Sequence, residues 1–423
     1  MGTGADERKI SEKVMRLLYL NTTYAGGGAE KVTRQIYEGM KKRGHEVYEI
    51  VCYNRRGEVE DPQVMVLYRT PLQKIWQRFQ THNRNNESVT IPYAVHKICQ
   101  FIKKYKIEIV HLNNPHDSFL GMKDIQTISR MCPTVWTLHD LWALTGHCAF
   151  PVGCEEERWK TGCQTCECLD NYPRLRRDVS ADLYEKKKKY FTGNKIVFTV
   201  PSQWMMEQVK VSYLKNECCS VIENSLDTMQ WQAFDKKVLR QEYGIATSKM
   251  VLAFVAADIS VPQKGMKLLG EVLKQLKPEK YLLLIAGKCG ETLENLTKTY
   301  ETRYLGYISD QRKMNEFYAL ADILVNPSVY ETFGLVNIEA MASGTPVVAF
   351  DVCAMREIIG SDAGWCLAEN TAEALEEKLK ELEADRGELQ KKAQRCRQRV
   401  ISCFEENKML DEYETLYGKM RGQ

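Results

Sequence analysis

The chain has 423 residues, of which 44% are apolar and 27% charged, and its 59 Lys and Arg nearly balance its 56 Asp and Glu. These are globular values, and a prior of one domain per ~150 residues predicts two or three domains. The formal charge of +3 argues against a dedicated nucleic-acid-binding protein, because such proteins carry a strong basic excess. We therefore expect no nucleic-acid partner.

The fifteen cysteines are an odd number spread over a long chain. Secreted disulfide scaffolds are short and pair their cysteines, so this usage favours a reducing compartment. Residues 1–13 are polar, lack the apolar region of a signal peptide and are expected to be disordered. No stretch reaches the ~18 consecutive apolar residues of a membrane-spanning helix. We expect a cytoplasmic protein.

The first predicted elements alternate between strand and helix. The apolar run 14–20 predicts a strand, 24–28 a turn, and apolar residues at helical spacing predict a helix over 29–43. Gly44 ends this helix, and a second strand follows over 45–52. This order is a βαβ unit, which implies parallel strands with a right-handed crossover.

Similar alternation continues along the chain and starts afresh at residue 250. The first series adds expected helices over 95–105, 124–131 and 183–191 and strands over 107–112, 134–138 and 195–200. The second has expected helices over 267–276, 310–319 and 334–342, and strands over 250–256, 281–286, 302–305, 323–326 and 346–349, before a helix-rich segment over 371–417. Two such series imply two α/β domains facing a cleft, with a linker between residues 202 and 227. Ligands bind such sheets at the carboxyl ends of the strands.

Three consecutive glycines, Gly26, Gly27 and Gly28, occupy the first strand-to-helix turn. Glycines let a ligand approach the backbone, and the N–H groups at a helix start favour an anion such as a diphosphate. The loop does not match the dinucleotide fingerprint, because Lys31 stands at its sixth position, and no P-loop lysine follows. On these residues alone, a plain tight turn explains the loop equally well.

A second candidate site runs from Glu331 through a strand-to-helix loop to Glu339, within the following helix. Two carboxylates so placed can bond sugar hydroxyls and a ribose, while the helix start faces phosphate. By spacing alone, the favoured explanation is a helix-start charge and an exposed helix glutamate.

Taken together, these segments resemble the large family 4 of retaining glycosyltransferases. The resemblance rests on Ser328-Val-Tyr-Glu331-Thr-Phe-Gly334, on Glu339 eight residues after Glu331, and on Gly344-Thr-Pro346 beyond. Gly26-Gly27-Gly28-Ala-Glu30, Asn224-Ser-Leu-Asp227, Lys264-Gly265, Gly306-Tyr307 and Tyr318-Ala-Leu-Ala-Asp322 also follow the family's order. The resemblance covers residues 16–402 and is more specific in the C-terminal half.

The resemblance implies the GT-B fold, an α/β architecture of two Rossmann-like domains facing across a cleft. We expect an acceptor domain over 14–201, a nucleotide-sugar domain over 202–400, and a helix over 401–423 that returns to the N-terminal domain. The implied reaction moves a hexosyl unit with retention from a UDP- or GDP-sugar to a hydroxyl of a surface polysaccharide or lipid-linked glycan. We expect no catalytic metal, because the sequence contains no Asp-x-Asp pair.

The resemblance also assigns roles to matching positions. Lys264 would neutralise the donor phosphates, Glu331 would hold the transferred sugar, and Glu339 would bind the ribose. His139, after an apolar strand, would lie over the reacting sugar, although a hydrogen-bonded loop histidine is an equal alternative. The catalytic candidates are thus His139, Lys264 and Glu331. The expected donor-binding residues are Gly26, Gly27, Gly28, Asp258, Tyr307, Thr332, Phe333, Gly334, Leu335 and Glu339.

One position departs from the family pattern. Family members commonly carry an arginine in a Gly-Arg pair before the lysine, whereas this chain reads Ala256-Ala257-Asp258-Ile259. A carboxylate at Asp258 cannot neutralise phosphate. Either Lys264 acts with another cation, such as Arg303 or Arg312, or the site is weakened. We favour the first alternative, because the lysine and both glutamates are present.

An insertion over residues 146–170 contains five of the cysteines. Two of them have the spacing of a structural zinc knuckle, and a metal would order a loop that has little core of its own. Free thiols are the main alternative, and a reducing compartment disfavours the other, disulfides. The predicted zinc ligands are Cys148, Cys154, Cys163 and Cys166, with Cys168 or His147 as substitutes. Because the insertion follows His139, we expect it to border the acceptor side of the cleft.

Two surface segments mix positive charge with apolar groups. Lys74, Trp76, Arg78 and Phe79 form one, and the lysine run 186–189 adds a cationic block. Such residues can contact an anionic membrane, at about 1 kcal/mol for each basic group. A solvated helix face over core aromatics is an equal alternative, so peripheral contact with the inner face of the cell membrane stays open.

Two other functions also stay open. A GT-B nucleotide-sugar epimerase would need no acceptor, and the pair Glu331 and Glu339 argues against it. A non-catalytic scaffold that binds partners through the cysteine-rich insertion is suggested by Asp258.

Overall fold

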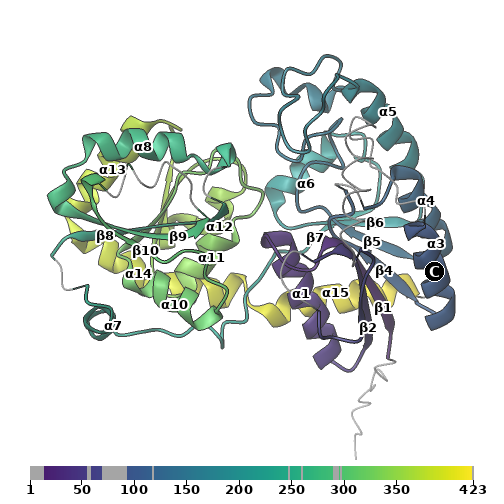
Figure 1. The fold of residues 1–423 in the computed structure, drawn as a ribbon, viewed down its shortest axis with the longest axis horizontal. Coiled ribbons are helices and arrows are strands. Elements are labelled where there is room, and N and C mark those ends of the chain that lie inside the picture. Colours follow the sequence, from purple (N-terminus) through teal and green to yellow (C-terminus); the bar gives the residue numbers. More distant parts are fainter. Residues whose placement is uncertain are drawn as a thin grey trace, which may run out of the picture.

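The computed structural model describes residues 14–54, 59–68, 93–116, 119–245, 248–258, 261–288, 295 and 298–421. They form two domains, each a parallel sheet with helices on both faces (Figure 1). The expected pair of Rossmann-like domains is therefore confirmed. Residues 1–13 and the segment containing Trp76 lie outside the described part of the chain.

The N-terminal sheet has seven strands in the order β3-β2-β1-β4-β5-β6-β7. They are β1 (Arg16–Thr23), β2 (Glu46–Tyr53), β3 (Val64–Val66), β4 (Ile109–Leu112), β5 (Thr134–Thr137), β6 (Ile196–Val200) and β7 (Cys219–Val221). The covering helices are α1 (Gly28–Lys42), α3 (Ala94–Tyr105), α4 (Met122–Met131), α5 (Ser180–Phe191) and α6 (Gln203–Lys210), with a 3-10 turn η1 (Glu155–Lys160). The strand order reverses between β1 and β4, and α/β sheets bind ligands beside such a reversal.

The C-terminal sheet has six strands in the order β10-β9-β8-β11-β12-β13. They are β8 (Met250–Asp258), β9 (Tyr281–Lys288), β10 (Glu301–Tyr304), β11 (Ile323–Asn326), β12 (Val347–Phe350) and β13 (Gly364–Leu367). The helices are α7 (Lys236–Glu242), α8 (Met266–Gln275), α10 (Gln311–Leu320), α11 (Leu335–Ala342), α12 (Met355–Ala363), α13 (Ala372–Ala384) and α14 (Arg386–Cys403), with 3-10 turns η2 (Pro262–Lys264) and η3 (Pro278–Lys280). Here the order reverses between β8 and β11.

The boundary between the domains differs from the expected one at residue 201. Helix α6 and strand β7 follow this residue, and β7 pairs with β6 at the edge of the N-terminal sheet. The N-terminal domain therefore extends to β7, and residues 202–227 are not a simple linker. A three-residue strand is too short to show an apolar period, which is why the sequence did not reveal it.

The last helix, α15 (Glu406–Arg421), returns to the N-terminal domain and lies along its sheet, in yellow in Figure 1. Its buried face packs with the inner residues of β1 and α1. Tyr417 Oη lies 2.7 Å from His111 Nδ1, and Tyr413 Oη lies 2.9 Å from Thr137 Oγ1. The expected returning helix is confirmed.

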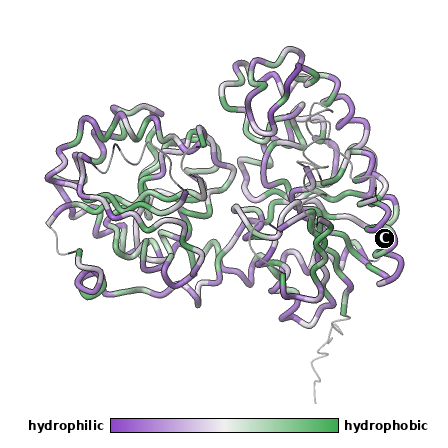
Figure 2. Tube along the Cα trace, viewed as in Figure 1, coloured by the Kyte–Doolittle hydropathy of each residue, from purple (hydrophilic) through white to green (hydrophobic). Residues whose placement is uncertain are grey.

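The cores follow the apolar pattern of the strands. Figure 2 shows hydrophobic residues concentrated in the central strands of both domains, with hydrophilic residues on the outer turns and helices. Strands buried on both faces need such continuous apolar runs. Within the described residues, no helix combines the length and the apolar composition needed to cross a membrane.

Candidate active site

Lys264 ends the turn η2, and a close backbone contact fixes its position. Gly265 has a φ of 68°, and a Cβ there would lie 1.8 Å from Pro327 O. Only glycine accepts both this conformation and this approach. The Val329 N–H also donates to Gln263 O at 2.9 Å. The loop after β8 is therefore anchored to the segment after β11.

Glu331 lies in that second segment, just before α11, and meets the lysine. Lys264 Nζ donates to Glu331 Oε2 at 2.5 Å. Gly334, with a φ of 83°, lets α11 begin beside the carboxylate, because a Cβ there would lie 3.1 Å from Glu331 Cγ and 2.6 Å from Asn337 Nδ2. The structure thus brings together two of the three predicted catalytic residues.

Glu339 lies on α11 and is 5% exposed. The Tyr318 hydroxyl donates to Glu339 Oε2 at 2.8 Å, and Lys31 Nζ donates to the other oxygen. The alternative of an exposed helix glutamate is therefore wrong. Sequence reasoning missed Lys31 as a site residue, and it noted Tyr318 only as part of a family motif.

The two domains touch at this place. The Thr332 hydroxyl donates to His139 O at 2.8 Å, and the Ser202 hydroxyl donates to Thr332 O at 3.0 Å. A Cβ on Gly28 would lie 3.4 Å from Leu335 Cδ1. The glycine loop, the end of β5 and the start of α11 therefore meet between the domains.

One N–H group of the glycine loop is already used by a side chain of the following helix. The Gly27 N–H donates to Glu30 Oε2 at 2.7 Å. An anion that used this N–H would have to displace the Glu30 carboxylate, so the loop offers fewer free donors than its sequence suggests.

His139 lies at the domain contact as a neutral imidazole. Its Nε2 donates to Asn113 Oδ1 at 2.9 Å. Burial lowers the pKa of His139 from 6.5 to about 4, helped by His116 and opposed by Asp140. At neutral pH the ring can therefore orient a hydroxyl without adding charge.

A second histidine beside it was missed from the sequence. His116 Nε2 lies 3.0 Å from Asp140 Oδ2, and both residues are buried. Burial raises the pKa of Asp140, but His116 and the Trp142 N–H together lower it more, so the net pKa lies below its ordinary value. His116 follows β4 in a loop without any motif, so nothing in its local sequence marked it.

The remaining predicted donor residues lie in different surroundings. Tyr307 follows β10 and is 46% exposed, and Asp258 ends β8, so both lie at the carboxyl edge of the C-terminal sheet. Phe333 instead packs inside the protein, 5.7 Å from the Phe404 ring. The two arginines proposed as partner cations form ion pairs elsewhere: Arg303 with Glu301 at 3.9 Å and Arg312 with Glu316 at 3.0 Å.

The cysteine-rich insertion has its own buried contacts. The Gly146 N–H donates to Cys163 Sγ at 3.2 Å, and His147 Nε2 lies 3.4 Å from Cys166 Sγ. Burial raises the pKa of Cys148 to about 12 and that of Cys163 to about 11, which favours thiols over thiolates. Across the described ranges, no three His, Cys, Asp or Glu side chains are placed to hold a metal ion. The structural zinc stays a prediction.

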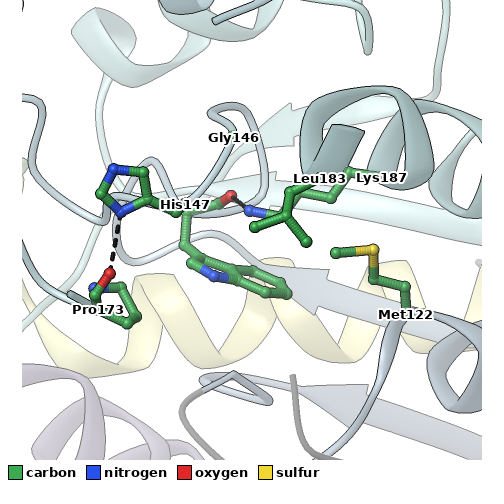
Figure 3. A pocket seen from close by; sticks show the side chains of 7 residues that line it. Met122, Gly146, His147, Pro173, Leu183 and Lys187 are labelled. Carbon is green, nitrogen blue, oxygen red and sulfur yellow. Dashed lines mark hydrogen bonds between the residues drawn. The ribbon is translucent and has the colours of Figure 1, made fainter. Parts of the chain in front are cut away.

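A small pocket lies beside this insertion (Figure 3). It is lined by Met122, Trp142, Gly146, His147, Pro173, Leu183 and Lys187. Lys187 is fully buried, and its Nζ donates to Trp142 O and to Thr145 O. Burial lowers the pKa of Lys187 to about 7. The prediction of a cationic surface block over 186–189 is therefore wrong for Lys187, because this side chain faces the core.

The insertion also touches the C-terminal domain. The ring of Phe150 lies 6.0 Å from that of Tyr330, and Trp204 lies 5.8 Å from the same tyrosine. Since Tyr330 directly precedes Glu331, the beginning of the insertion lies next to the candidate site.

Two family models match the chain in tandem. Residues 26–230 match "Glycosyltransferase Family 4", and residues 235–401 match "Glycosyl transferases group 1". The chain belongs to the family 4, group 1 glycosyltransferases. This glycosyltransferase is 27% identical over 380 residues to WcaC of Escherichia coli K12, a glycosyl transferase assigned to colanic acid biosynthesis, covering 84% of this chain and 88% of that protein.

Solved structures show the same architecture. Sucrose-phosphate synthase from Thermosynechococcus elongatus superposes with a TM-score of 0.74 at 18% identity, over 96% of this chain and 99% of that one. HepE from Anabaena, in complex with UDP-glucose, gives a TM-score of 0.66 at 18% identity, over 96% of this chain and 100% of that one. The fold of this glycosyltransferase is therefore the expected GT-B fold.

Proposed function

We propose that this glycosyltransferase moves a hexosyl unit from a UDP- or GDP-sugar to a hydroxyl of a surface polysaccharide or lipid-linked glycan, with retention of configuration. The observation that carries the proposal is the ion pair between Lys264 and Glu331 at the start of α11, facing the N-terminal domain. A nucleotide-sugar donor also agrees with HepE, which was solved with UDP-glucose. A glycan acceptor agrees with the assignment of WcaC to colanic acid biosynthesis.

The geometry gives each side chain a task in this reaction. The Lys264 ammonium and the positive end of α11 would stabilise the charge that grows on the departing diphosphate. Glu331 would accept hydrogen bonds from the transferred sugar, and Glu339 from the ribose. The neutral His139 would orient a sugar hydroxyl. Lys264 and Glu331 are bonded to each other, so the donor would exchange this contact for the phosphates and the sugar without bringing either side chain from elsewhere.

The proposed chemical step is a front-face substitution. The bond from the anomeric carbon to the diphosphate oxygen breaks, and its electron pair leaves with the nucleoside diphosphate. The acceptor oxygen bonds to the anomeric carbon on the same face, and its proton passes to the departing diphosphate. No side chain serves as a covalent nucleophile in this scheme.

The test is nucleotide release from a panel of UDP-, GDP- and ADP-hexoses, with and without a lipid-linked glycan acceptor. We expect release from a UDP- or GDP-sugar, and a loss of about 10²–10³-fold in Lys264→Ala, as when one transition-state donor is removed. Lys267→Ala, an exposed lysine on α8, is the matched control and should retain wild-type turnover.

Three results would decide against the proposal. Wild-type turnover by Lys264→Ala would remove the phosphate role of that lysine. Conversion of a nucleotide sugar into its epimer without an acceptor would favour the epimerase. Absence of nucleotide release from every donor, with a lipid-linked acceptor present, would favour a non-catalytic scaffold. The anomeric configuration of the product, measured by NMR, tests retention.

We also propose that the enzyme works in the cytoplasm at the inner face of the cell membrane, where a lipid-linked acceptor would be presented. Flotation with vesicles that contain anionic lipid tests this at low salt. Binding to anionic vesicles that is lost with neutral vesicles or at high salt supports a charged contact. Failure to float at low salt would rule it out.

A further inference from the structure

Lys31 on the N-terminal domain contacts the carboxylate that we assign to the ribose. We propose that Lys31 is the second cation of the donor-phosphate site and supplies the charge that the absent arginine would bring. The ribose hydroxyls would take Glu339 Oε1 from the lysine, and the ammonium would turn to the diphosphate. This inference rests on the proposed function, since it uses the roles given there to Lys264 and Glu339.

The contact joins the two domains. Lys31 lies in the first turn of α1, directly after the glycine loop, and Glu339 lies 308 residues later on α11. The lysine side chain is 42% exposed, whereas the carboxylate is 6% exposed. Lys31 Nζ also lies 5.6 Å from the centroid of the buried Trp231 ring. The lysine therefore reaches from solvent to a buried acid at the domain boundary.

The two oxygens of Glu339 are held in different ways. Oε2 accepts the Tyr318 hydroxyl, which is buried and fixed on α10. Oε1 accepts the half-exposed Lys31 ammonium on a flexible stem. A ribose needs at least one of these oxygens. Because the lysine side chain is partly in solvent and the tyrosine hydroxyl is buried, the lysine is the partner that a ribose would replace more easily.

The starts of helices α1 and α11 determine where the Lys31 ammonium can move. A Cβ on Gly28 would lie 3.4 Å from Leu335, the first residue of α11, so the starts of α1 and α11 are in contact. Leu335 and Glu339 are one helical turn apart, which is about 5–6 Å along the axis. A phosphate at the start of α11 would therefore lie within reach of Lys31 when the ribose lies at Glu339.

The charges of the site favour the same assignment. The carboxylates of Glu331 and Glu339 are matched by Lys264 and Lys31. Without Lys31, the remaining Lys264, Glu331 and Glu339 would carry a net charge of −1 before any diphosphate binds. Arg303 and Arg312, the cations considered from the sequence, are paired with glutamates on β10 and α10. Lys31 is thus the cation that the domain contact places on Glu339, as Lys264 is placed on Glu331.

Calorimetric titration of the full chain tests the proposal with nucleoside, nucleoside monophosphate and nucleoside diphosphate of the base that wild type prefers. We expect Lys31→Met to weaken diphosphate binding about 10- to 100-fold, from one charge at roughly 6 Å in a medium of intermediate dielectric. Nucleoside binding should change by less than about threefold, because the lost contact is with phosphate. Lys31→Arg keeps the charge and should retain diphosphate binding.

Lys42→Met, an exposed lysine at the end of α1, is the matched control and should bind as wild type does. Equal loss of nucleoside and diphosphate affinity in Lys31→Met would overturn the inference, as would unchanged or tighter diphosphate binding. Tighter binding would mean that Lys31 only blocks Glu339. If the wild-type protein binds no UDP, GDP or ADP at all, the proposed function itself fails. If the wild-type protein binds the diphosphate and Lys31→Met binds it equally well, only the role of the lysine is refuted.

Discussion

Gly265→Ala tests whether the backbone contact behind Lys264 is as close as the structure shows. The left-handed conformation at φ 68° costs an alanine about 1–2 kcal/mol. The added Cβ would also lie 1.8 Å from Pro327 O, and relief of such overpacking typically costs about 1–3 kcal/mol. The two costs together predict a loss of about 2–5 kcal/mol in the free energy of unfolding, a large part of a usual total of about 5–15 kcal/mol.

Urea denaturation followed by circular dichroism measures this loss. Gly270→Ala is the matched control, because it lies in α8, the helix that Gly265 precedes, and a Cβ there would meet nothing within 4 Å. In a helix interior this change should stabilise the protein by about 0.5–1 kcal/mol. The two substitutions should therefore have opposite signs. A Gly265→Ala variant within 1 kcal/mol of wild type would refute the reasoning, and so would normal donor turnover, since Lys264 would then not depend on this contact.

Three further predictions concern other buried groups. Burial lowers the pKa of His111 from 6.5 to about 3. Between about pH 6 and 4 the unfolded chain therefore binds one more proton at this residue than the folded chain does. The free energy of unfolding should fall by about 1.4 kcal/mol for each unit by which the pH is lowered in this range. His111→Asn should remove this slope from urea denaturation at stepped pH, and an unchanged slope would contradict it. Tyr318→Phe removes a hydrogen bond to Glu339 and should weaken nucleotide binding about tenfold in a titration; equal affinity would show that this contact does not orient the carboxylate. Replacing Cys163 and Cys166 with Ser should abolish the binding of one zinc per chain and reduce acceptor transfer more than donor hydrolysis. Wild-type protein that contains far less than one zinc per chain and is unaffected by a chelator would remove the zinc hypothesis.

Most of the elements were predictable, because each has a local signal. The apolar run 14–20 became β1, and the helical spacing after the glycine loop became α1. Strands of a parallel sheet covered on both faces must be apolar along their length, so the sheets stand out in the sequence. β7 has only three residues and partial burial, and no local pattern separates such a strand from a loop.

The candidate site was predictable to the extent that its residues belong to short motifs. Lys264, Glu331 and Glu339 were each marked by neighbours in the chain, and the structure places the first two in contact. His116 carries no motif. Lys187 was taken for part of a charged block, although it is buried against Trp142. Charge in a sequence does not reveal which side of a helix faces the core.

The sequence by itself determined two βα series, the order of the motifs and the family, because these depend on spacing along one chain. Its composition also excluded a strongly basic nucleic-acid binder. Only the tertiary structure decided which charges meet. Lys31 and Glu339 stand 308 residues apart, and they are joined because α1 and α11 begin beside each other at the domain contact. The energy of an ion pair depends on separation in space and on burial, and neither quantity is written in local sequence.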